Sequence, residues 1–264
     1  MVPGRNTIVN KMMVSIYKTN QLMGDSAAAE AEEYLNQIVS QKGGANIIFA
    51  TANSQLTFFK SLKMRKLIDW SKINIFHMDE YIGLPPGHPA LFQEMLRKHL
   101  IAYLSIRPKS FFTLPVQAEN IEEACMQHEL LLKKYPPDIC IMGIGENGHI
   151  AFNDPPYADF DDKQWVKIVK LDEISRIQQV KEGHFQSIED IPSYAMTLSI
   201  PALLSAKKIL CLVPEERKAA AVREVLFGPV TENCPGSILR NYEHVHMFLD
   251  QEAASLILNL IQPI

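Results

Sequence analysis

Short apolar runs alternate along the chain with longer segments in which apolar residues recur at helical spacing. The apolar runs predict strands at residues 46–50, 73–78, 138–142, 166–169, 195–198, 208–213 and 245–249. The segments of helical period predict helices at residues 27–40, 54–67, 90–104, 121–135, 215–226 and 252–261. Strands that are regularly followed by helices are typical of an α/β protein.

Two of the predicted strands are continuously apolar. Residues 139–142 and 209–213 show no alternation of apolar and polar positions, which indicates strands buried on both faces. We therefore expect a doubly wound α/β fold, in which a mainly parallel sheet carries helices on both faces in a Rossmann-like, three-layer sandwich. One domain spanning residues 1–264 accounts for this length. Residues 155–190 are the least regular part and are a candidate for a loop that closes over a ligand.

Composition narrows the classes of partner. Hydrophobic residues make up 47% of the chain and charged residues 21%, as in ordinary globular proteins. The net charge of -4 carries no long block of like charge, which argues against nucleic acid as the main partner. No apolar run approaches the length of a membrane span, so we expect no membrane association.

The N-terminus and the cysteines predict a cytoplasmic protein. Residues 1–18 have a lysine inside their apolar stretch and no small-residue cleavage site, so they do not resemble a signal peptide. The four cysteines lie far apart in the sequence and form no CxxC pair. We expect them to be reduced and mostly buried.

In sheets of this kind, ligands bind beyond the carboxyl ends of the strands. The first such end carries Thr51, Ala52, Asn53 and Ser54, just where a helix is predicted to begin. A helix N-terminus offers unpaired N–H groups and a partial positive charge, so this turn suits a phosphate group. Alternatively, Ser54 is simply the residue that caps the helix.

The second strand end carries two adjacent carboxylates, Asp79 and Glu80. Neighbours on extended backbone point to opposite sides, so only one of them faces a given ligand, where it would be a general base. The alternative is an acidic turn exposed to solvent.

The third strand end has Gly143, Gly145 and Gly148 at GxGxxG spacing. A dinucleotide-binding loop of that pattern must open a helix, whereas Pro155 and Pro156 soon prevent one. The glycines instead indicate backbone with unusual dihedral angles that lets a ligand approach closely, with Gly145 as a contact.

His149 follows these glycines directly. A histidine in a tight polar loop suits proton transfer near neutral pH, and Asp154 is near enough in sequence to bind one ring nitrogen. A structural histidine is the alternative.

Lys218 follows the strand at 208–213 in the first turn of a predicted helix, where the helix dipole disfavours a cation. An anionic ligand nearby explains this position, and a surface pair with Glu215 or Glu216 is the alternative.

A catalytic metal is not expected. His77, Asp79, His88, His149 and Asp154 are possible ligands, but their spacing matches no common metal motif.

The strand-end residues resemble one enzyme family. The sequence reads MDEYIGLP at residues 78–85 and GIGENGHIAFNDP at residues 143–155, and AMT at 195–197 and RKA at 217–219 follow in the same order. This pattern is similar to that of the glucosamine-6-phosphate deaminase (isomerase) family and covers most of the chain.

The resemblance implies conversion of glucosamine 6-phosphate, a phosphorylated amino sugar, to fructose 6-phosphate and ammonia, without metal or organic cofactor. By position, Asp79 matches the base that moves a proton between C2 and C1. His149 matches the residue that assists ring opening, with Asn147 and Asp154 orienting it. Lys218 and the turn at 51–54 match the phosphate-binding residues.

Four departures place the chain in a divergent branch of that family. The phosphate turn lacks the usual glycines, Asn147 stands where an acidic residue is usual, and Asp154 is one methylene shorter than the usual glutamate. Glutamine occupies the position of the family's phosphate-binding arginine, so Arg176 is the candidate that substitutes for it.

Two rival functions remain at this stage. The 6-phosphogluconolactonases also have a glycine-histidine loop, but theirs continues with threonine, alanine and serine, whereas this chain has Ile150, Ala151, Phe152 and Asn153. A sensor that binds a sugar phosphate without turnover would have no need for Asp79.

Members of the family are monomers or symmetric hexamers, and the amphipathic residues 253–261 can pack internally or against a second copy.

Overall fold

The fold is known from a computed structural model that describes residues 4–155, 157–181, 183 and 185–261. Its strands are β1 (Arg5–Val9), β2 (Met12–Tyr17), β3 (Ala45–Phe49), β4 (Ile73–His77), β5 (Asp79–Ile82), β6 (Ser110–Phe112), β7 (Ile139–Met142), β8 (Val166–Lys170), β9 (Tyr194–Leu198), β10 (Lys208–Val213) and β11 (Val245–Asp250). Its α-helices are α1 (Asn20–Lys42), α2 (Leu56–Leu62), α3 (Phe92–His99), α4 (Ile121–Lys134), α5 (Glu173–Lys181), α6 (Ile200–Leu204) and α7 (Ala219–Phe227).

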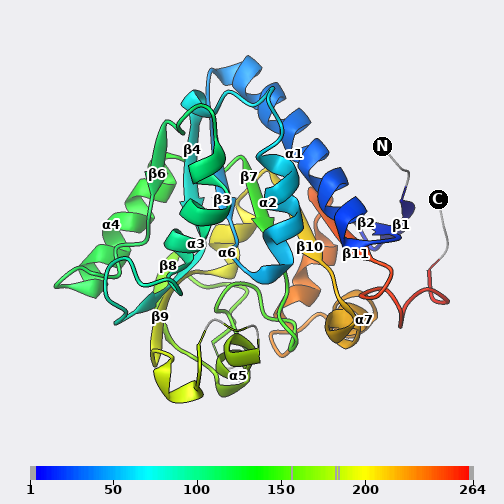
Figure 1. Ribbon diagram of the computed structural model, residues 1–264. Coiled ribbons are helices and arrows are strands. Elements are labelled where there is room, and N and C mark those ends of the chain that lie inside the picture. Colours follow the sequence, from blue (N-terminus) through cyan, green and yellow to red (C-terminus); the bar gives the residue numbers. More distant parts are fainter. Residues whose placement is uncertain (1–3, 156, 182, 184, 262–264) are drawn as a thin grey trace.

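Eight strands form the central sheet in the order β1-β2-β11-β10-β7-β3-β4-β6 (Figure 1). Every neighbouring pair is parallel except the β1–β2 hairpin at one edge. After β3, the next two strands of the central sheet along the chain, β4 and β6, are added on one side of β3. The strand that follows them, β7, pairs with β3 on its other side. This reversal of strand order opens a crevice between the loops that follow β3 and β7.

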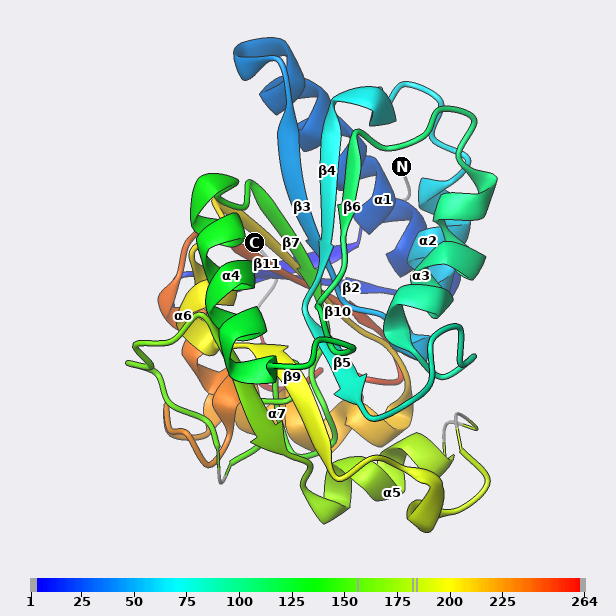
Figure 2. The same ribbon diagram turned by 90° about the vertical axis from the view of Figure 1, so that its left-hand side faces the viewer.

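Helices cover both faces of this sheet. Residues of α1, α2 and α3 pack on one face in a core that includes Leu35, Phe58 and Leu96. Residues of α4, α6 and α7 pack on the other face, and Figure 2 shows the two groups on opposite sides. The predicted doubly wound, mainly parallel α/β sandwich is therefore confirmed.

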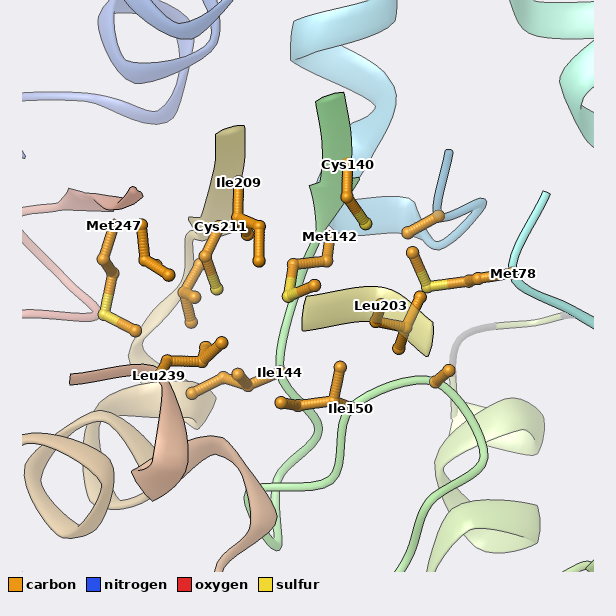
Figure 3. Packing of buried hydrophobic residues seen from close by; sticks show 14 of the residues in the cluster. Met78, Cys140, Met142, Ile144, Ile150, Leu203, Ile209, Cys211, Leu239 and Met247 are labelled. Carbon is orange, nitrogen blue, oxygen red and sulfur yellow. The ribbon is translucent and has the colours of Figure 1, made fainter. Parts of the chain in front are cut away.

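The core on the face of α4, α6 and α7 extends from the strands into a loop. Figure 3 shows Met142 of β7 near Ile144 and Ile150, which belong to the segment that follows β7 and share one apolar cluster with Cys140. Ile150 is 1% exposed, and burial of a side chain of this size stabilises the fold by ~1.5–3 kcal/mol. The segment after β7 is thus anchored from below by apolar contacts.

A second sheet differs from the prediction of one sheet. The strands expected at 166–169 and 195–198 exist as β8 and β9, but they form a separate antiparallel sheet with β5 in the order β5-β9-β8. The chain leaves the central sheet at Met78, whose N–H donates to Phe49 in β3 and whose carbonyl accepts from Leu198 in β9. One residue therefore joins β4 of the first sheet to β5 of the second.

Two terminal segments also differ from the prediction. The helix predicted at 252–261 is wrong, because residues 251–260 form successive turns that bury Ala253, Ala254 and Ile257 against the core. The β1–β2 hairpin was not predicted, since its exposed apolar residues Ile8 and Met13 obscure the alternation expected of an edge strand. The irregular region at 155–190 includes β8 and α5.

A network of polar side chains connects the β1–β2 hairpin to α1. The Ser15 hydroxyl lies 2.7 Å from Nε2 of His246 on β11, and Nδ1 of His246 lies 2.8 Å from Glu30 on α1. Lys208 pairs with the same Glu30 at 2.7 Å. Since Ser15 is 1% exposed and also donates to Asn6, this cluster satisfies buried polar groups between the layers.

The four cysteines are free and buried. Within the described ranges, none of the helices is both long and apolar enough to cross a membrane.

We expect Gly24→Ala to destabilise the protein, although this change usually stabilises a helix interior. A Cβ atom at position 24 of α1 would lie 2.9 Å from the backbone nitrogen of Phe58 in α2. Forcing the helices apart should lower the free energy of unfolding by ~1–2 kcal/mol, as in other overpacked cores. Urea denaturation measures this value. Gln37→Ala on the exposed side of α1 is the control, and it should not lower stability.

Candidate functional site

A cavity lies at the crevice where the strand order reverses. Its lining comes from the loops that follow β3, β4, β7 and β10, together with one residue each of α3 and α5. The lining residues are Ala50, Thr51, Ala52, Ser54, Gln55, Met78, Asp79, Phe92, Gly143, Ile144, Gly145, His149, Ala151, Phe152, Gln179, Arg217 and Lys218. All three strand ends singled out by the sequence, and the lysine after β10, therefore meet in one place.

Asp79 is the carboxylate that faces this cavity. It is the first residue of β5 and is 9% exposed. Burial, with a smaller contribution from the charge of Glu80, raises the pKa of Asp79 to about 8. A carboxyl group with this pKa exchanges a proton in the neutral range, as a general acid or base does.

Glu80 points the other way and is fully buried. Its carboxylate accepts hydrogen bonds from the backbone N–H groups of Phe92 and Gln93, both at 2.9 Å, at the first turn of α3. Burial raises the pKa of Glu80 to about 7, although these hydrogen bonds oppose the rise. Of the two adjacent carboxylates, Glu80 therefore caps a helix and Asp79 is the candidate base; neither belongs to a solvent-exposed turn.

His149 is oriented by the two residues that were expected to orient it. Nδ1 of His149 lies 2.9 Å from Oδ1 of Asp154, and the side-chain amide of Asn147 donates to the same oxygen at 2.9 Å. The backbone N–H of His149 in turn donates to Oδ1 of Asn147 at 3.1 Å. Because the carboxylate accepts, Nδ1 carries the proton. The shorter aspartate thus reaches the ring directly.

The glycines of this loop make room for the imidazole ring. A Cβ atom on Gly145 would lie 2.1 Å from the His149 ring, so the ring rests directly on the glycine backbone. Gly148 has a φ of +82°, and a Cβ atom there would lie 2.6 Å from Sγ of Cys234. Two positions in GIGENGH are therefore glycine for steric reasons.

The far end of the loop is fixed to the second sheet. The N–H of Phe152 donates to the Thr197 hydroxyl, and the side chain of Asn153 donates to the carbonyls of Ile150 and Leu198. Thr197 is also the residue of β9 that pairs with Asp79. The strand β9 therefore sets the position of the histidine loop relative to Asp79.

The turn after β3 supplies hydroxyl groups. Thr51 is 4% exposed, and its hydroxyl has no hydrogen-bond partner among the described residues. Ser54 lies in a short 3-10 helix, Asn53–Gln55, and its hydroxyl accepts from the Gln55 side chain at 3.1 Å. Since α2 begins only at Leu56 without a side-chain cap, the interpretation of Ser54 as a helix cap is wrong. Ala52 lines the cavity, whereas Asn53 is not part of its lining.

Lys218 is buried to 3% exposure and lines the same cavity. It ends a 3-10 turn, Glu216–Lys218, and α7 follows from Ala219. A buried ammonium group in a cavity that is also lined by Thr51 and Ser54 is suited to an anion.

Arg176 is not brought to the cavity, which corrects its expected role. Its guanidinium donates to the backbone carbonyls of Ile188 at 2.6 Å and Ile191 at 3.3 Å. Gln179, about one turn further along α5, lines the cavity instead, and its amide oxygen has no partner within the described part of the chain.

The candidate metal ligands serve other purposes. The two ring nitrogens of His77 lie 2.9 Å from the carbonyl of Asp79 and 2.9 Å from the N–H of Leu114. Burial lowers the pKa of His77 to about 3, so the ring is neutral. The described residues contain no group of three or more His, Cys, Asp or Glu side chains placed to hold a metal ion.

Several lining residues were not predicted from the sequence, notably Gln55, Phe92, Gln179 and Arg217. Arg217 had a signal in its position beside Lys218. Phe92 and Gln179 lie on helices far from any strand end, and only the tertiary fold brings them to the cavity.

The chain is similar in sequence to known proteins. Residues 18–247 match the family model described as glucosamine-6-phosphate isomerases/6-phosphogluconolactonase. A glucosamine-6-phosphate deaminase from Exiguobacterium sibiricum is 36% identical over 221 residues, which are 84% of each chain.

Solved structures have the same fold. A monomeric glucosamine-6-phosphate deaminase superposes with a TM-score of 0.84 and 29% identity, covering 92% of this chain and 99% of that one. A 6-phosphogluconolactonase from Thermotoga maritima has a TM-score of 0.72 and 17% identity, covering 90% of this chain and 98% of that one. The second likeness concerns the fold alone.

We expect Asp79→Asn to raise the melting temperature at pH 7–8. Because the pKa of Asp79 is about 8 in the folded protein and about 4 in an unfolded chain, ionisation favours the unfolded state. The native protein thus loses stability as the pH rises from 4 to 8, and asparagine removes that loss. Calorimetry at pH 4 and at pH 8 measures the difference in melting temperature between Asp79→Asn and the native protein, which should be larger at pH 8. An equal difference at the two pH values would contradict the burial of a charge here, and the exposed Asp161→Asn is the control.

Proposed function

Because the chain belongs to the family of glucosamine-6-phosphate isomerases and 6-phosphogluconolactonases, we propose that it converts glucosamine 6-phosphate to fructose 6-phosphate and ammonia. One observation carries the proposal most directly. A buried carboxyl group whose pKa is about 8 shares a cavity with a histidine oriented by Asp154 and with a buried lysine. A base, a ring-opening group and an anion site are the three parts that this reaction needs.

The phosphate is the natural ligand for the end of the cavity near Lys218. The ammonium group of Lys218 and the hydroxyls of Thr51 and Ser54 offer donors, and a phosphate dianion only accepts hydrogen bonds. Binding at this remote group fixes the sugar against Asp79 and His149. This chain holds the phosphate without a contribution from Arg176.

His149 assists opening of the pyranose ring. The ring oxygen must receive a proton while the C1 hydroxyl loses one, and an imidazole exchanges protons near neutral pH. Asp154 holds the imidazole in one orientation and stabilises its positive charge while that charge is present.

Asp79 then moves a proton between carbons. The carboxylate takes the proton from C2 of the open chain and returns it to C1, while the C1 oxygen gains a proton and the amino group loses one, which converts the amino aldose into a protonated C2 imine. Water adds to this imine, and ammonia leaves to give the ketose. Burial beside Glu80 makes the Asp79 carboxylate a stronger base than an exposed aspartate.

The comparisons favour this reaction over lactone hydrolysis. The relatives and the solved structure named as deaminases are 29–36% identical to the chain, whereas the 6-phosphogluconolactonase structures are 15–18% identical. Lactone hydrolysis also requires no base for abstraction of a carbon-bound proton, which is the task that suits the buried Asp79.

The direct test is incubation with glucosamine 6-phosphate and measurement of ammonia and fructose 6-phosphate. We expect turnover by the native protein and a loss of at least ~100-fold in kcat for Asp79→Asn, the scale of a lost general base. The exposed Asp161→Asn should retain full activity. Hydrolysis of 6-phosphogluconolactone without release of ammonia would contradict the proposal, and so would equal activity in the Asp79 variant.

The rate should depend on pH through Asp79. Since the base acts only when deprotonated, kcat/KM should rise through the neutral range, reach half of its maximum near pH 8 and level off only above that pH. An ordinary aspartate with a pKa near ~4 would add no pH dependence between pH 6 and 8. Initial rates between pH 6 and 8, corrected for the separately measured ionisation of the substrate, distinguish the raised pKa from the ordinary one. The rise in kcat should lie at lower pH than the rise in kcat/KM, because the ammonium group of bound substrate stabilises the ionised Asp79 carboxylate.

Gly145→Ala should reduce activity while leaving the fold intact. The new methyl group would lie 2.1 Å from the imidazole and would displace it from Asp154. A displacement of ~1 Å costs ~100-fold in rate in other enzymes, so kcat should fall on that scale. Circular dichroism should show native secondary structure. Undiminished kcat would remove His149 from the mechanism.

The cytoplasm is the compartment we expect for this enzyme, because its four buried thiols are free. Size-exclusion chromatography with light scattering would show whether the chain is a monomer or a homo-oligomer.

A further inference from the structure

Arg217 connects the two segments that carry His149 and Lys218. Its Nε atom lies 2.5 Å from Glu215, in the turn that carries Lys218, and its Nη1 atom lies 3.2 Å from Glu146, in the histidine loop. These segments follow different strands, β10 and β7. Arg217 also lines the cavity. We call the three residues Glu146, Arg217 and Glu215 the arginine clamp.

The backbone of Glu215 is strained. Its φ of 80° and ψ of 140° lie in a region that is essentially restricted to glycine. Its N–H points at both carboxylate oxygens of Asp250, at 3.1 Å each, and Asp250 is 3% exposed. The carbonyl of Glu215 accepts from the N–H of Lys218 at 3.0 Å. This conformation therefore starts the turn that places Lys218 in the cavity.

Glycine would adopt the same conformation without strain, and its backbone could keep both hydrogen bonds. What glutamate adds is a carboxylate for Arg217. Strained residues persist at functional sites where their side chains serve a purpose that a relaxed residue could not.

We propose that Arg217 is a positioning residue, which holds the histidine loop and the lysine turn at a fixed separation through Glu146 and Glu215. The sugar is attached at its phosphate end beside Lys218 and reacts beside His149, so the distance between these groups decides how well it is aligned. This inference rests on the proposed deaminase reaction. The clamp acts through His149 and Lys218 rather than on the substrate.

The Glu215→Gly variant distinguishes a positioning role of the arginine clamp from a contribution to stability. We expect the melting temperature to stay level or rise, because the strain is relieved, while kcat/KM falls about tenfold, less than the ~100-fold of a 1 Å misplacement. A merely structural role would change both in the same direction. Unchanged kcat/KM in a stable Glu215→Gly variant would overturn the proposal.

A comparison of Arg217→Gln and Glu146→Gln separates the clamp from direct contact with phosphate. If Arg217 acts through Glu146, each variant should lose activity to a similar extent, and the double variant should lose little more than either one. If Arg217 touches the phosphate, only its own variant should weaken competitive inhibition by inorganic phosphate; that result would overturn the proposal. Lys133→Gln, which breaks the surface pair with Glu129 on α4, is the control and should be neutral.

Arg217→Lys tests the geometry of the clamp. A lysine keeps the charge, but its single ammonium group cannot reproduce the two-sided contact of a guanidinium, so activity should lie between those of the native protein and Arg217→Gln. Full activity in the lysine variant would show that charge alone matters and would count against the clamp.

Failure of the proposed function can be told apart from failure of the clamp. If the native protein releases no ammonia, the deaminase proposal fails. Binding of inorganic phosphate, measured by calorimetry, then still tests the clamp without turnover, because a displaced Lys218 should weaken phosphate binding in Glu146→Gln and Glu215→Gly as well as in Arg217→Gln. Native phosphate affinity in the first two would overturn it.

Discussion

The burial of the Asp79 carboxylate is the constraint on which the rest of the site depends. Water would lower its pKa and weaken it as a base, so the fold must surround it while leaving one side open to the cavity. The second sheet does this, because the chain leaves β4 at Met78 and enters β5 at Asp79. Glu80 is buried beside it, and α3 makes this tolerable by offering two N–H groups to that second carboxylate.

The same small sheet also places the histidine. Thr197 of β9 pairs with Asp79 through the backbone and accepts a hydrogen bond from Phe152 in the histidine loop. Ile144 and Ile150 anchor that loop in the core below β7, as Figure 3 shows. Asp79 and His149, the proposed base and ring-opening residue, therefore share one scaffold, while Lys218 belongs to a turn after β10. In the proposed reaction the substrate contacts both parts, so a link between them has a clear purpose.

The sequence predicts those features that depend on neighbours in the chain. Apolar runs such as 209–213 identify the buried strands, and the glycines around His149 reveal a loop with special backbone. The second sheet escaped prediction because β5 and β9 meet only through pairing across more than 100 residues. For the same reason, the side chain of Arg176 was expected in the cavity, but two distant carbonyls attract its guanidinium. Residues 252–261 have helical spacing, yet burial against the core holds them in successive turns.

Local preference and tertiary structure disagree mainly around the cavity. Three non-glycine residues in the described part of the chain have positive φ: Asn10, Ala151 and Glu215. Asn10 lies in the turn of the β1–β2 hairpin, where asparagine adopts this conformation readily. Ala151 lines the cavity two residues after His149, and Glu215 starts the turn of Lys218. Both the strain and the burial of the Asp79 carboxyl group oppose stability, and both lie where the proposed reaction aligns the sugar and transfers a proton. Stability is thus lower in the three segments to which we assign the proposed chemistry, and the apolar core beneath them compensates.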